Sequence, residues 1–454
     1  MDISFLSSNI LHRETEFVRH TIIGSPNSGQ HYLDVDAKLL FDHIRTLSNE
    51  ASDFLFFATA VYGADKMALR AKHAEDRWTR SLNLEIPVLE PEKWTLAKKA
   101  LEESIGFLTG DLWDFTFIKA NRGPFARRTN RIKSPKGVIL APTVSLLSGG
   151  LDSFAGAIKF LEDDLQSPLI LASHYDGKVA GPKSDQGNVI QALMNYYPKR
   201  IQHIRVRVGV GNTGDNGDEP APEFETSFRS RSLVFLAVAF AVASAVKKPP
   251  QIAIPENGAI ALNFPLNPSR RGSCSTRTVH PHFLKLIHVA LEQIGLTNEI
   301  INPFEFLTKG QVNECVSEFP AFSSAYKRTN SCAKSGHNFS WENRLASACG
   351  RCVPCLFRRA SLHRIQLDNE TFGNEVLKIY SGRDDLPDDF RSLLDLVRRN
   401  PDDKSIMRGL IANGSLPTIQ LPEYAALVSR MIGEVRQWLS DKAPKSLKTI
   451  AAIK

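Results

Sequence analysis

The chain has 454 residues, of which 42% are hydrophobic and 23% are charged. A chain of this size and composition can bury a large core, and its length favours two or three domains over one. No uninterrupted apolar run is long enough to span a bilayer, and the first residues lack the basic and then apolar layout of a signal peptide. We therefore expect a globular, cytoplasmic protein with no membrane contact.

The formal net charge of +7 permits contact with nucleic acid but gives little support for it. Lysines and arginines are scattered rather than gathered in one basic run. Pairs such as Arg127-Arg128, Arg270-Arg271 and Arg358-Arg359 suit a solvated face as well as an anion contact.

Residues 1–133 are predicted to form a small α+β extension. An aromatic and apolar run covers residues 53–62, apolar residues alternate over 84–89, and residues 113–118 resemble a strand.

The segment Ser148-Gly149-Gly150-Leu151-Asp152-Ser153 is the strongest sign of a ligand site. It lies between residues 144–147, predicted to end a buried strand, and residues 154–161, predicted to form a helix. Adjacent glycines allow a tight turn that brings backbone N–H groups to an anion, serine hydroxyls add donors, and the helix N-terminus adds partial positive charge. The segment therefore predicts a pyrophosphate site, with a capped strand-to-helix turn as the alternative.

A second set of polar residues, His174-Tyr175-Asp176, follows the apolar run 169–172. This pattern predicts the carboxyl end of a second parallel strand, where ligands bind in open α/β sheets, and His174 and Tyr175 are candidates to flank an adenine. A strand-end turn with a capping Asp explains the same residues equally well. The Ala-rich run over residues 233–246 predicts a buried helix.

Four cysteines fall late in the chain: Cys332, Cys349, Cys352 and Cys355. Closely spaced thiolates can converge on one tetrahedral zinc ion, so we expect a closed, structural zinc site in which Gly350 relaxes the turn between ligands. An iron–sulfur cluster and a redox-active Cys-x-x-Cys pair are the alternatives.

The two remaining thiols have different surroundings in the sequence. Cys315 lies in a predicted amphipathic helix and is interpreted as a small buried hydrophobe. Cys274 lies in a polar, basic stretch at residues 270–277 and is a candidate for a substrate site, although a passive loop residue is an equal alternative. Residues 369–454 are predicted to form a helical C-terminal extension, because residues 390–397 and 424–439 have helical periodicity.

The glycine-rich segment, the stretch Pro303 to Lys309 and the four cysteines occur in this order in one chain. The loop lacks both the lysine of a P-loop and the Gly-x-Gly-x-x-Gly pattern of dinucleotide folds. It resembles the PP-loop of the N-type ATP pyrophosphatases, and the three motifs together resemble the QueC family, the 7-cyano-7-deazaguanine synthases of the queuosine pathway. The resemblance covers about residues 138–364.

The resemblance implies a doubly wound, mostly parallel α/β fold of the adenine nucleotide α-hydrolase (PP-loop) type over residues 134–368, with a zinc knuckle. It implies ATP as cofactor, with Mg²⁺ and Zn²⁺. The implied nucleotide-binding residues are Ser148, Gly149, Gly150, Leu151, Asp152, Ser153, His174 and Tyr175. Asp152 would orient the nucleotide or Mg²⁺, while Lys309 with Arg229 or Arg231 would stabilise developing negative charge. A solvated lysine at a helix start is the alternative for Lys309.

The substrate side departs from the family. Glu256 and Asn257 lie in a segment similar to one that faces the nucleotide in the synthases, but the expected Tyr-Pro-Asp-Cys-Arg segment is replaced by residues 272–277, which include Cys274 and Arg277. With its long flanks, the chain resembles the enlarged QueC-like proteins of anti-phage operons, closest to the QatC proteins of the Qat system.

This resemblance implies that ATP activates the carboxylate of 7-carboxy-7-deazaguanine with release of pyrophosphate. An amine, expected to be the N-terminus of a partner protein from the same defence operon, would then displace AMP. The alternatives are nitrile synthesis with ammonia, a tRNA-modifying PP-loop enzyme, and a catalytically silent nucleotide-binding scaffold.

Overall fold

The computed structural model describes residues 1–11, 17–23, 31–123, 125, 135–212, 223–267, 277–335 and 337–453. The strands in these ranges are β1 (Asp2–Leu11), β2 (Phe17–Ile23), β3 (His31–Asp36), β4 (Ser81–Val88), β5 (Leu112–Lys119), β6 (Thr143–Leu146), β7 (Leu169–Tyr175), β8 (Ile201–Asn212), β9 (Gln251–Ala253) and β10 (Ile300–Ile301).

The helices in the same ranges are α1 (Lys38–His43), α2 (Asn49–Met67), α3 (Arg70–His73), α4 (Pro91–Thr109), α5 (Leu151–Asp163), α6 (Pro182–Tyr196), α7 (Arg231–Ala243), α8 (Gly258–Ala261), α9 (Pro281–Ile294), α10 (Lys309–Glu314), α11 (Pro320–Ala325), α12 (Val353–Arg364), α13 (Asp388–Arg399), α14 (Asp403–Ile411), α15 (Leu421–Lys442) and α16 (Lys445–Ile450). Among these described helices, none is both long and apolar enough to cross a membrane.

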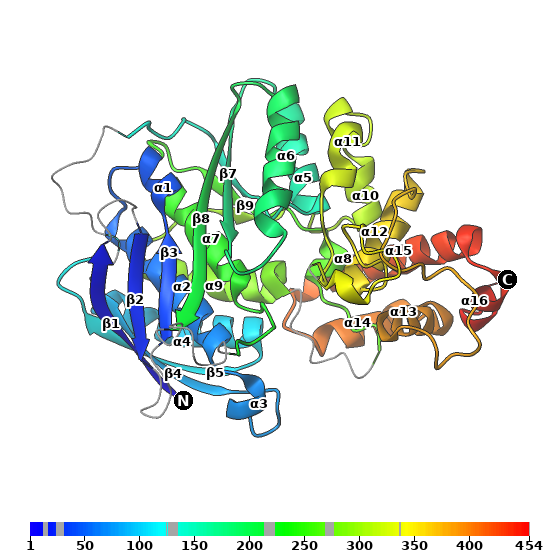
Figure 1. Ribbon diagram of the computed structural model, residues 1–454, viewed down its shortest axis with the longest axis horizontal. Helices are drawn as coiled ribbons and strands as arrows, with labels where there is room; N and C mark the ends of the chain where they lie inside the picture. The colour runs from blue at the N-terminus through cyan, green and yellow to red at the C-terminus, as the bar shows by residue number, and fades with distance from the viewer. Residues whose placement is uncertain are drawn as a thin grey trace.

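The described strands form one ten-stranded sheet in the order β10-β9-β6-β7-β8-β3-β2-β1-β4-β5 (Figure 1). Neighbouring strands are parallel from β10 to β8 and from β1 to β5. They are antiparallel from β8 through β3 and β2 to β1. The protein is therefore a mixed α/β protein with a mostly parallel sheet, as the sequence predicted.

Helices cover both faces of the central strands because successive side chains of a strand point to opposite faces. In β7, Leu169 and Leu171 pack in a cluster with α5 and α6, whereas Ile170 and Ala172 join the larger cluster that contains α2 and α7. All four side chains are essentially inaccessible to solvent. An uninterrupted apolar run is the pattern of a strand that is covered on both sides.

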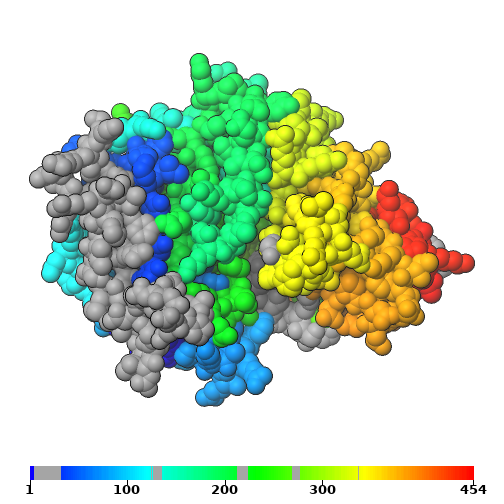
Figure 2. Space-filling view, in the orientation of Figure 1, coloured from blue at the N-terminus to red at the C-terminus, as the bar shows by residue number. Residues whose placement is uncertain are grey.

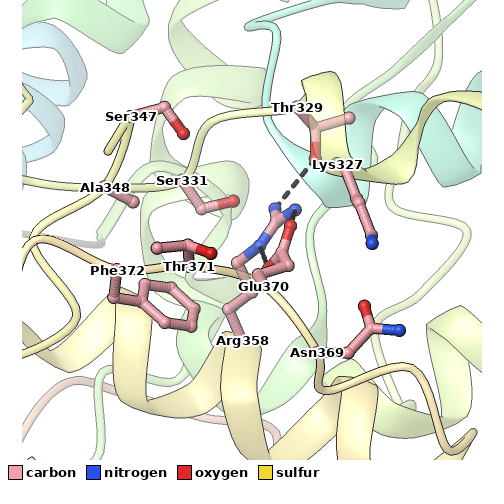
Figure 3. Close-up of a pocket in the computed structure, with 10 residues that line it drawn as sticks. All are labelled: Lys327, Thr329, Ser331, Ser347, Ala348, Arg358, Asn369, Glu370, Thr371 and Phe372. Carbon is pink, nitrogen blue, oxygen red and sulfur yellow. Dashed lines mark hydrogen bonds and ion pairs between the residues drawn. The ribbon is translucent and has the colours of Figure 1, made fainter. Parts of the chain in front are cut away.

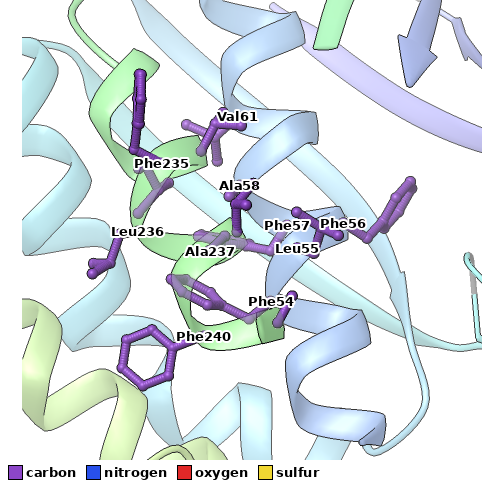
Figure 4. Packing of buried hydrophobic residues seen from close by; sticks show 14 of the residues in the cluster. Phe54, Leu55, Phe56, Phe57, Ala58, Val61, Phe235, Leu236, Ala237 and Phe240 are labelled. Carbon is purple, nitrogen blue, oxygen red and sulfur yellow. The ribbon is translucent and has the colours of Figure 1, made fainter. Parts of the chain in front are cut away.

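The buried helix predicted over residues 233–246 is α7, which spans Arg231–Ala243, and it packs side by side with α2 (Figure 4). Phe54 of α2 meets Phe240 of α7 edge to face, with ring centroids 5.7 Å apart. Both helices are buried almost all round, which explains why neither has a polar face in its sequence.

The sheet continues across the boundary predicted at residues 133 and 134. Six residues of β3, His31 to Asp36, pair with Asn212 to Arg207 of β8. Without β3, β8 would be an edge strand with unpaired backbone groups. The elements before residue 133 therefore share the sheet and the main core with the central strands.

A buried ion network ties the N-terminal elements to the start of α7. The guanidinium of Arg80, which is fully buried, bonds to the carboxylates of Asp65 at 2.5 Å and Asp111 at 2.6 Å. Asp65 also accepts a hydrogen bond of 2.7 Å from the hydroxyl of Ser230, the residue before α7. The N-terminal part thus fixes the position from which Arg231 projects.

Helices α13 to α16 lie at the opposite end of the molecule from β1 (Figure 1). They form a separate apolar cluster with α8 and α12, in which Phe390, Tyr424 and Trp438 are fully buried. Helix α15 also contacts the first turn of α10, since Glu434 accepts a hydrogen bond of 3.2 Å from the backbone N–H of Gly310. The C-terminal helices therefore support the start of α10.

Candidate functional site

The glycine-rich segment forms the turn between β6 and α5, as its sequence predicted. Gly149 has a φ of +89°, which residues other than glycine rarely adopt. A Cβ at this position would lie 2.9 Å from the backbone nitrogen of Gln186 in α6. Both the backbone conformation and the close approach of α6 therefore require glycine here.

The two serines of the turn hold its shape. The hydroxyl of Ser148 accepts a hydrogen bond of 3.2 Å from the backbone N–H of Gly150. The hydroxyl of Ser153 donates a bond of 3.0 Å to the carbonyl of Gly150 and lies 3.2 Å from the hydroxyl of Ser148. The N-terminus of α5 and both hydroxyls thus lie together at one edge of the sheet.

An open pocket of about 240 Å³ lies over this turn. Its lining comes from the turn, the N-terminal ends of α6, α7 and α10, the segment after β9, and the region of the cysteines; the residues are Ser148, Gly150, Leu151, Asp152, Ser153, Pro182, Asp185, Arg231, Pro255, Glu256, Ile260, Lys309, Asn330, Ser331, Cys332, Ser335 and Pro354. In the sheet, β7 lies on one side of β6 and β9 on the other. A pocket beyond the carboxyl end of such a strand is the usual ligand position in open α/β sheets.

Asp152 and Lys309, two of the predicted catalytic residues, form a buried ion pair in the pocket lining. The Nζ atom of Lys309 lies 2.6 Å from Oδ2 of Asp152, and their side chains are 5% and 9% exposed. Asn257 donates a hydrogen bond of 3.1 Å to the same Oδ2 atom. Lys309 is thus not a solvated lysine at a helix start.

This pairing changes what Asp152 can offer to a cation. The Lys309 ammonium and the Asn257 amide both contact Oδ2, so Oδ1 is the carboxylate oxygen of Asp152 that remains without a donor among the described residues.

Burial and the two neighbouring acids set the charge at this site. Burial opposes ionisation of Asp152, but the Lys309 ammonium and hydrogen bonds hold the pKa of Asp152 below its ordinary value. Burial and the negative charge of Asp152 raise the pKa of Glu256 well above its ordinary value. Glu256 is therefore the more basic of the two acids, and Asp152 is the one that ionises first as pH rises.

Arg231 is the cation of the described pocket lining that has no carboxylate within 4 Å. Its guanidinium lies 5.5 Å from the ring centroid of Phe235 and 5.9 Å from that of Phe228. Burial lowers the pKa of Arg231, yet a guanidinium remains protonated at neutral pH. A buried cation with no close counter-ion favours binding of an anion at this wall of the pocket.

Arg229 and Arg277, which were predicted as catalytic and substrate-binding residues, do not line this pocket. Arg229 donates a hydrogen bond of 2.7 Å to the carbonyl of Thr109 and stacks on Trp78 at 4.1 Å. Arg277 donates 2.8 Å to the carbonyl of Phe107. Both guanidinium groups therefore bind carbonyls in the last turn of α4. The candidate Cys274 lies outside the described residues.

His174 and Tyr175 lie at the carboxyl end of β7, as predicted, but neither lines the pocket. His174 is fully buried between Tyr62 and Phe235, with ring centroids 5.6 and 5.4 Å away. Burial, with a contribution from Arg231, lowers the pKa of His174 well below its ordinary value, so the ring is neutral. Tyr175 instead faces Arg205, whose guanidinium lies 5.0 Å from the ring centroid.

The four late cysteines converge, as their spacing predicted. The Sγ atoms of Cys332, Cys349, Cys352 and Cys355 all lie within 4.8 Å of one another. Gly350 has a φ of +79°, which allows the chain to turn between the second and third thiols. Four thiolates at this separation suit a tetrahedral zinc ion.

Backbone N–H groups surround the sulfur atoms. Arg351 and Cys352 donate to the Sγ atom of Cys349 at 3.4 and 3.3 Å, and Lys334 donates to that of Cys332 at 3.3 Å. Donors directed at sulfur stabilise the thiolate form that binds metal. The residues therefore fit a structural metal site.

The cysteine cluster and the pocket share a segment. Cys332 belongs to the cluster and also lines the pocket. The two residues before Cys332 bind the glycine-rich turn. The backbone N–H of Asn330 donates a hydrogen bond of 3.0 Å to the carbonyl of Gly149, and the Ser331 hydroxyl accepts one of 3.4 Å from the N–H of Leu151. Figure 2 shows the segment near residue 340, in yellow, packed between the green central part and the orange C-terminal part. The cluster thus anchors one wall of the pocket.

A second, smaller pocket of about 170 Å³ lies on the other side of this segment (Figure 3). Its principal cation, Arg358, is buried and makes a two-point ion pair with Glu370, with both N···O distances 2.6 Å. Arg358 also donates 2.8 Å to the Thr329 hydroxyl. Because Arg358 and Glu370 satisfy one another, the cation that this pocket still offers to a ligand is the exposed Lys327.

The sequence did not single out Asp185, Asn330 or Ser331 as members of the site. Asp185 lies in the first turn of α6, where a Pro-x-x-Asp start was the available signal. Asn330 and Ser331 directly precede Cys332, and only the approach of the cysteine region to the glycine-rich turn brings them to the pocket.

Comparisons of the chain with protein-family models, with curated proteins and with solved structures found no significant match. What the fold and the site define is a mixed α/β protein with a polar pocket over a glycine-rich turn and a four-cysteine cluster beside it.

Proposed function

We propose that the protein is an ATP-dependent ligase of the QueC-like kind. It would adenylate the carboxylate of 7-carboxy-7-deazaguanine, release pyrophosphate, and pass the acyl group to an amine with release of AMP. The acceptor would be the N-terminus of a partner protein, and the setting anti-phage defence of the QatC kind.

The observation that carries this proposal is the convergence of three separate sequence segments on one pocket. The glycine-rich turn, Lys309 at the start of α10, and Arg231 at the start of α7 all line it. Hydroxyl groups, a helix N-terminus and a cation without a close counter-ion are the groups that bind a triphosphate.

The charge arrangement supports transfer of an adenylyl group. Attack of a substrate carboxylate on the α-phosphorus of ATP increases negative charge on the phosphate oxygens, and fixed cations lower the energy of that state. Arg231 is available for this role, whereas Lys309 is shared with Asp152. Lys309 would therefore orient the glycine-rich turn through its ion pair with Asp152. Its positive charge would act on the phosphates only in part, because Asp152 offsets it.

The test measures exchange of labelled pyrophosphate into ATP with purified protein and 7-carboxy-7-deazaguanine. We expect exchange that depends on this carboxylate. Arg231→Met should reduce it by roughly 10²-fold or more, the usual effect of removing one group that stabilises a charged transition state. Lys159→Met is the matched control, because Lys159 is partly exposed on α5 and pairs with Asp163 away from the pocket.

Exchange that is independent of the carboxylate, or equal in wild type and Arg231→Met, would contradict the proposal. The acceptor is tested separately by intact mass measurement of proteins co-expressed with this chain. A deazaguanine acyl mass on an N-terminus supports protein ligation, whereas free nitrile formed with ammonia returns the protein to the synthase reaction.

A further inference from the structure

Glu256 is an acid of the pocket wall that has no place in the phosphate-binding role above. It follows β9 and directly precedes Asn257, the N-cap of α8. The side chain of Asn302 fixes the backbone of Glu256 from both sides. It accepts a hydrogen bond of 3.3 Å from the Glu256 N–H and donates one of 2.8 Å to the Glu256 carbonyl. Asn257 donates 3.3 Å to Oε1 of Glu256. The carboxyl group is thus held at the pocket by neighbours on two segments.

Glu256 and Asp152 form a pair of carboxyl groups with one balancing ammonium. Asp152 is 7% exposed and lines the same pocket, but the Lys309 ammonium and the Asn257 amide both bind its Oδ2 atom. Its Oδ1 atom is buried and has no hydrogen-bond donor among the described residues unless Glu256 is protonated. Glu256 lines the pocket as well and is more exposed than Asp152, so it is the member of the pair that a bound substrate reaches more readily.

We propose that Glu256 accepts the proton of the attacking amine in the second half-reaction, an inference that rests on the proposed function. The amine nitrogen uses its lone pair to attack the acyl carbon of the adenylate, and the carbonyl π electrons move to oxygen. One N–H proton passes to ionised Glu256. The carbon–oxygen bond to phosphate then breaks, and its electron pair leaves with AMP. The products are the amide, AMP and one proton, which Glu256 returns to solvent.

The charged groups that face Glu256 set the pH at which this step runs. Burial comes first, then Asp152 on α5, and both raise the pKa of Glu256, whereas Lys309 on α10 lowers it. Asp185 on α6 and Arg231 on α7 line the same pocket. Because a base must be ionised to accept a proton, the transfer step should accelerate as pH rises through a pKa well above the ordinary value of 4.5.

The test separates the two half-reactions in Glu256→Gln. Ammonia serves as the acceptor at a constant concentration of its free base, and hydroxylamine traps the adenylate chemically. We expect pyrophosphate exchange and hydroxamate formation close to wild type, with amide formation from ammonia reduced by roughly 10²-fold or more. The rise of the wild-type rate with pH should disappear, and Glu256→Asp should restore part of both.

Two controls make the result decisive. Asp185→Asn removes another acid of the same pocket and should leave the pH dependence of amide formation in place. Equal loss of exchange and transfer in Glu256→Gln, unchanged transfer, or loss of the pH dependence in Asp185→Asn instead would overturn the inference. Absence of pyrophosphate exchange in the wild type would contradict the proposed function itself, and this outcome is distinguishable from the three above.

Discussion

The cysteine cluster and the pocket lie side by side but are built in opposite ways. All four thiols of the cluster come from residues 332–355, and three of them from seven consecutive residues. The charged groups of the pocket come from five segments between Asp152 and Lys309, on four helices and the strand-end segment after β9.

This difference determines how each site responds to change. A cluster of one residue type binds one ion, so loss of a single ligand removes the site. The pocket balances acids against cations, so loss of one member leaves its partner buried and unpaired.

Removal of the metal should cause the largest loss. Cys352→Ser, or a strong chelator, should abolish bound zinc and lower the melting temperature markedly, because structural zinc binding contributes about 10–16 kcal/mol in small zinc domains. Elemental analysis and thermal unfolding measure both effects. Cys315→Ser is the control, since Cys315 is an exposed free thiol outside the cluster and not the buried residue that its sequence predicted. Stoichiometric zinc in Cys352→Ser would contradict a four-cysteine site.

Breaking the buried ion pair should have the next largest effect. Asp152→Ala leaves the Lys309 ammonium buried without its partner at 2.6 Å, which should cost about 3–5 kcal/mol of unfolding free energy. The double variant Asp152→Ala with Lys309→Met should recover much of that loss, because both charges are gone. Urea unfolding of the four proteins measures the coupling, and simple additivity of the two single effects would argue against the pair.

A methyl group at the turn should have a smaller effect. Gly149→Ala forces a positive φ on alanine and places its Cβ 2.9 Å from the backbone of Gln186, so we expect a loss of about 1–3 kcal/mol. Gly137→Ala is a matched control with a φ of +84° and no atom within 4 Å of the added Cβ. Equal losses in the two variants would show that the approach of α6 does not matter.

The smallest effect concerns the pH dependence of stability at Asp185. Burial raises the pKa of Asp185 from 3.8 to about 6, so the folded state binds its proton more tightly than the unfolded state. Stability should therefore fall as pH rises from about 4 to 6, and Asp185→Asn should flatten that part of the profile. Melting temperatures across this range test the sign. A melting temperature that rises with pH over this range in the wild type, and rises equally in Asp185→Asn, would refute this prediction.

The cysteine cluster and the pocket also differ in how much of each could be predicted from the sequence. The cysteine set and the turn between β6 and α5 could be predicted because their residues are close in sequence and their chemistry is local. The pairing of Lys309 with Asp152 joins residues 157 positions apart. Nothing in the local pattern indicates that this lysine would be neutralised and that Arg231 would remain without a close acid.

Arg229 and Arg231 show why the charged residues of the pocket could not be identified without the tertiary structure. The two residues are separated by one position and were equally good candidates from sequence. At the start of α7 their side chains point to different parts of the protein, Arg229 to the carbonyl of Thr109 and Arg231 to the pocket. The contact between Ser230 and Asp65 sets that orientation, and it depends on an ion network from the first 111 residues.

Features with local causes could be predicted from the residues alone: the apolar runs covered on both faces, the glycine that permits a positive φ, and the thiols spaced to converge. The continuation of the sheet through the predicted boundary at residue 133, and the pairing of the buried charges, became visible in the folded chain. Backbone conformation and ligand spacing depend on neighbours in the chain, whereas ionisation depends on burial and on partners that folding brings from distant segments.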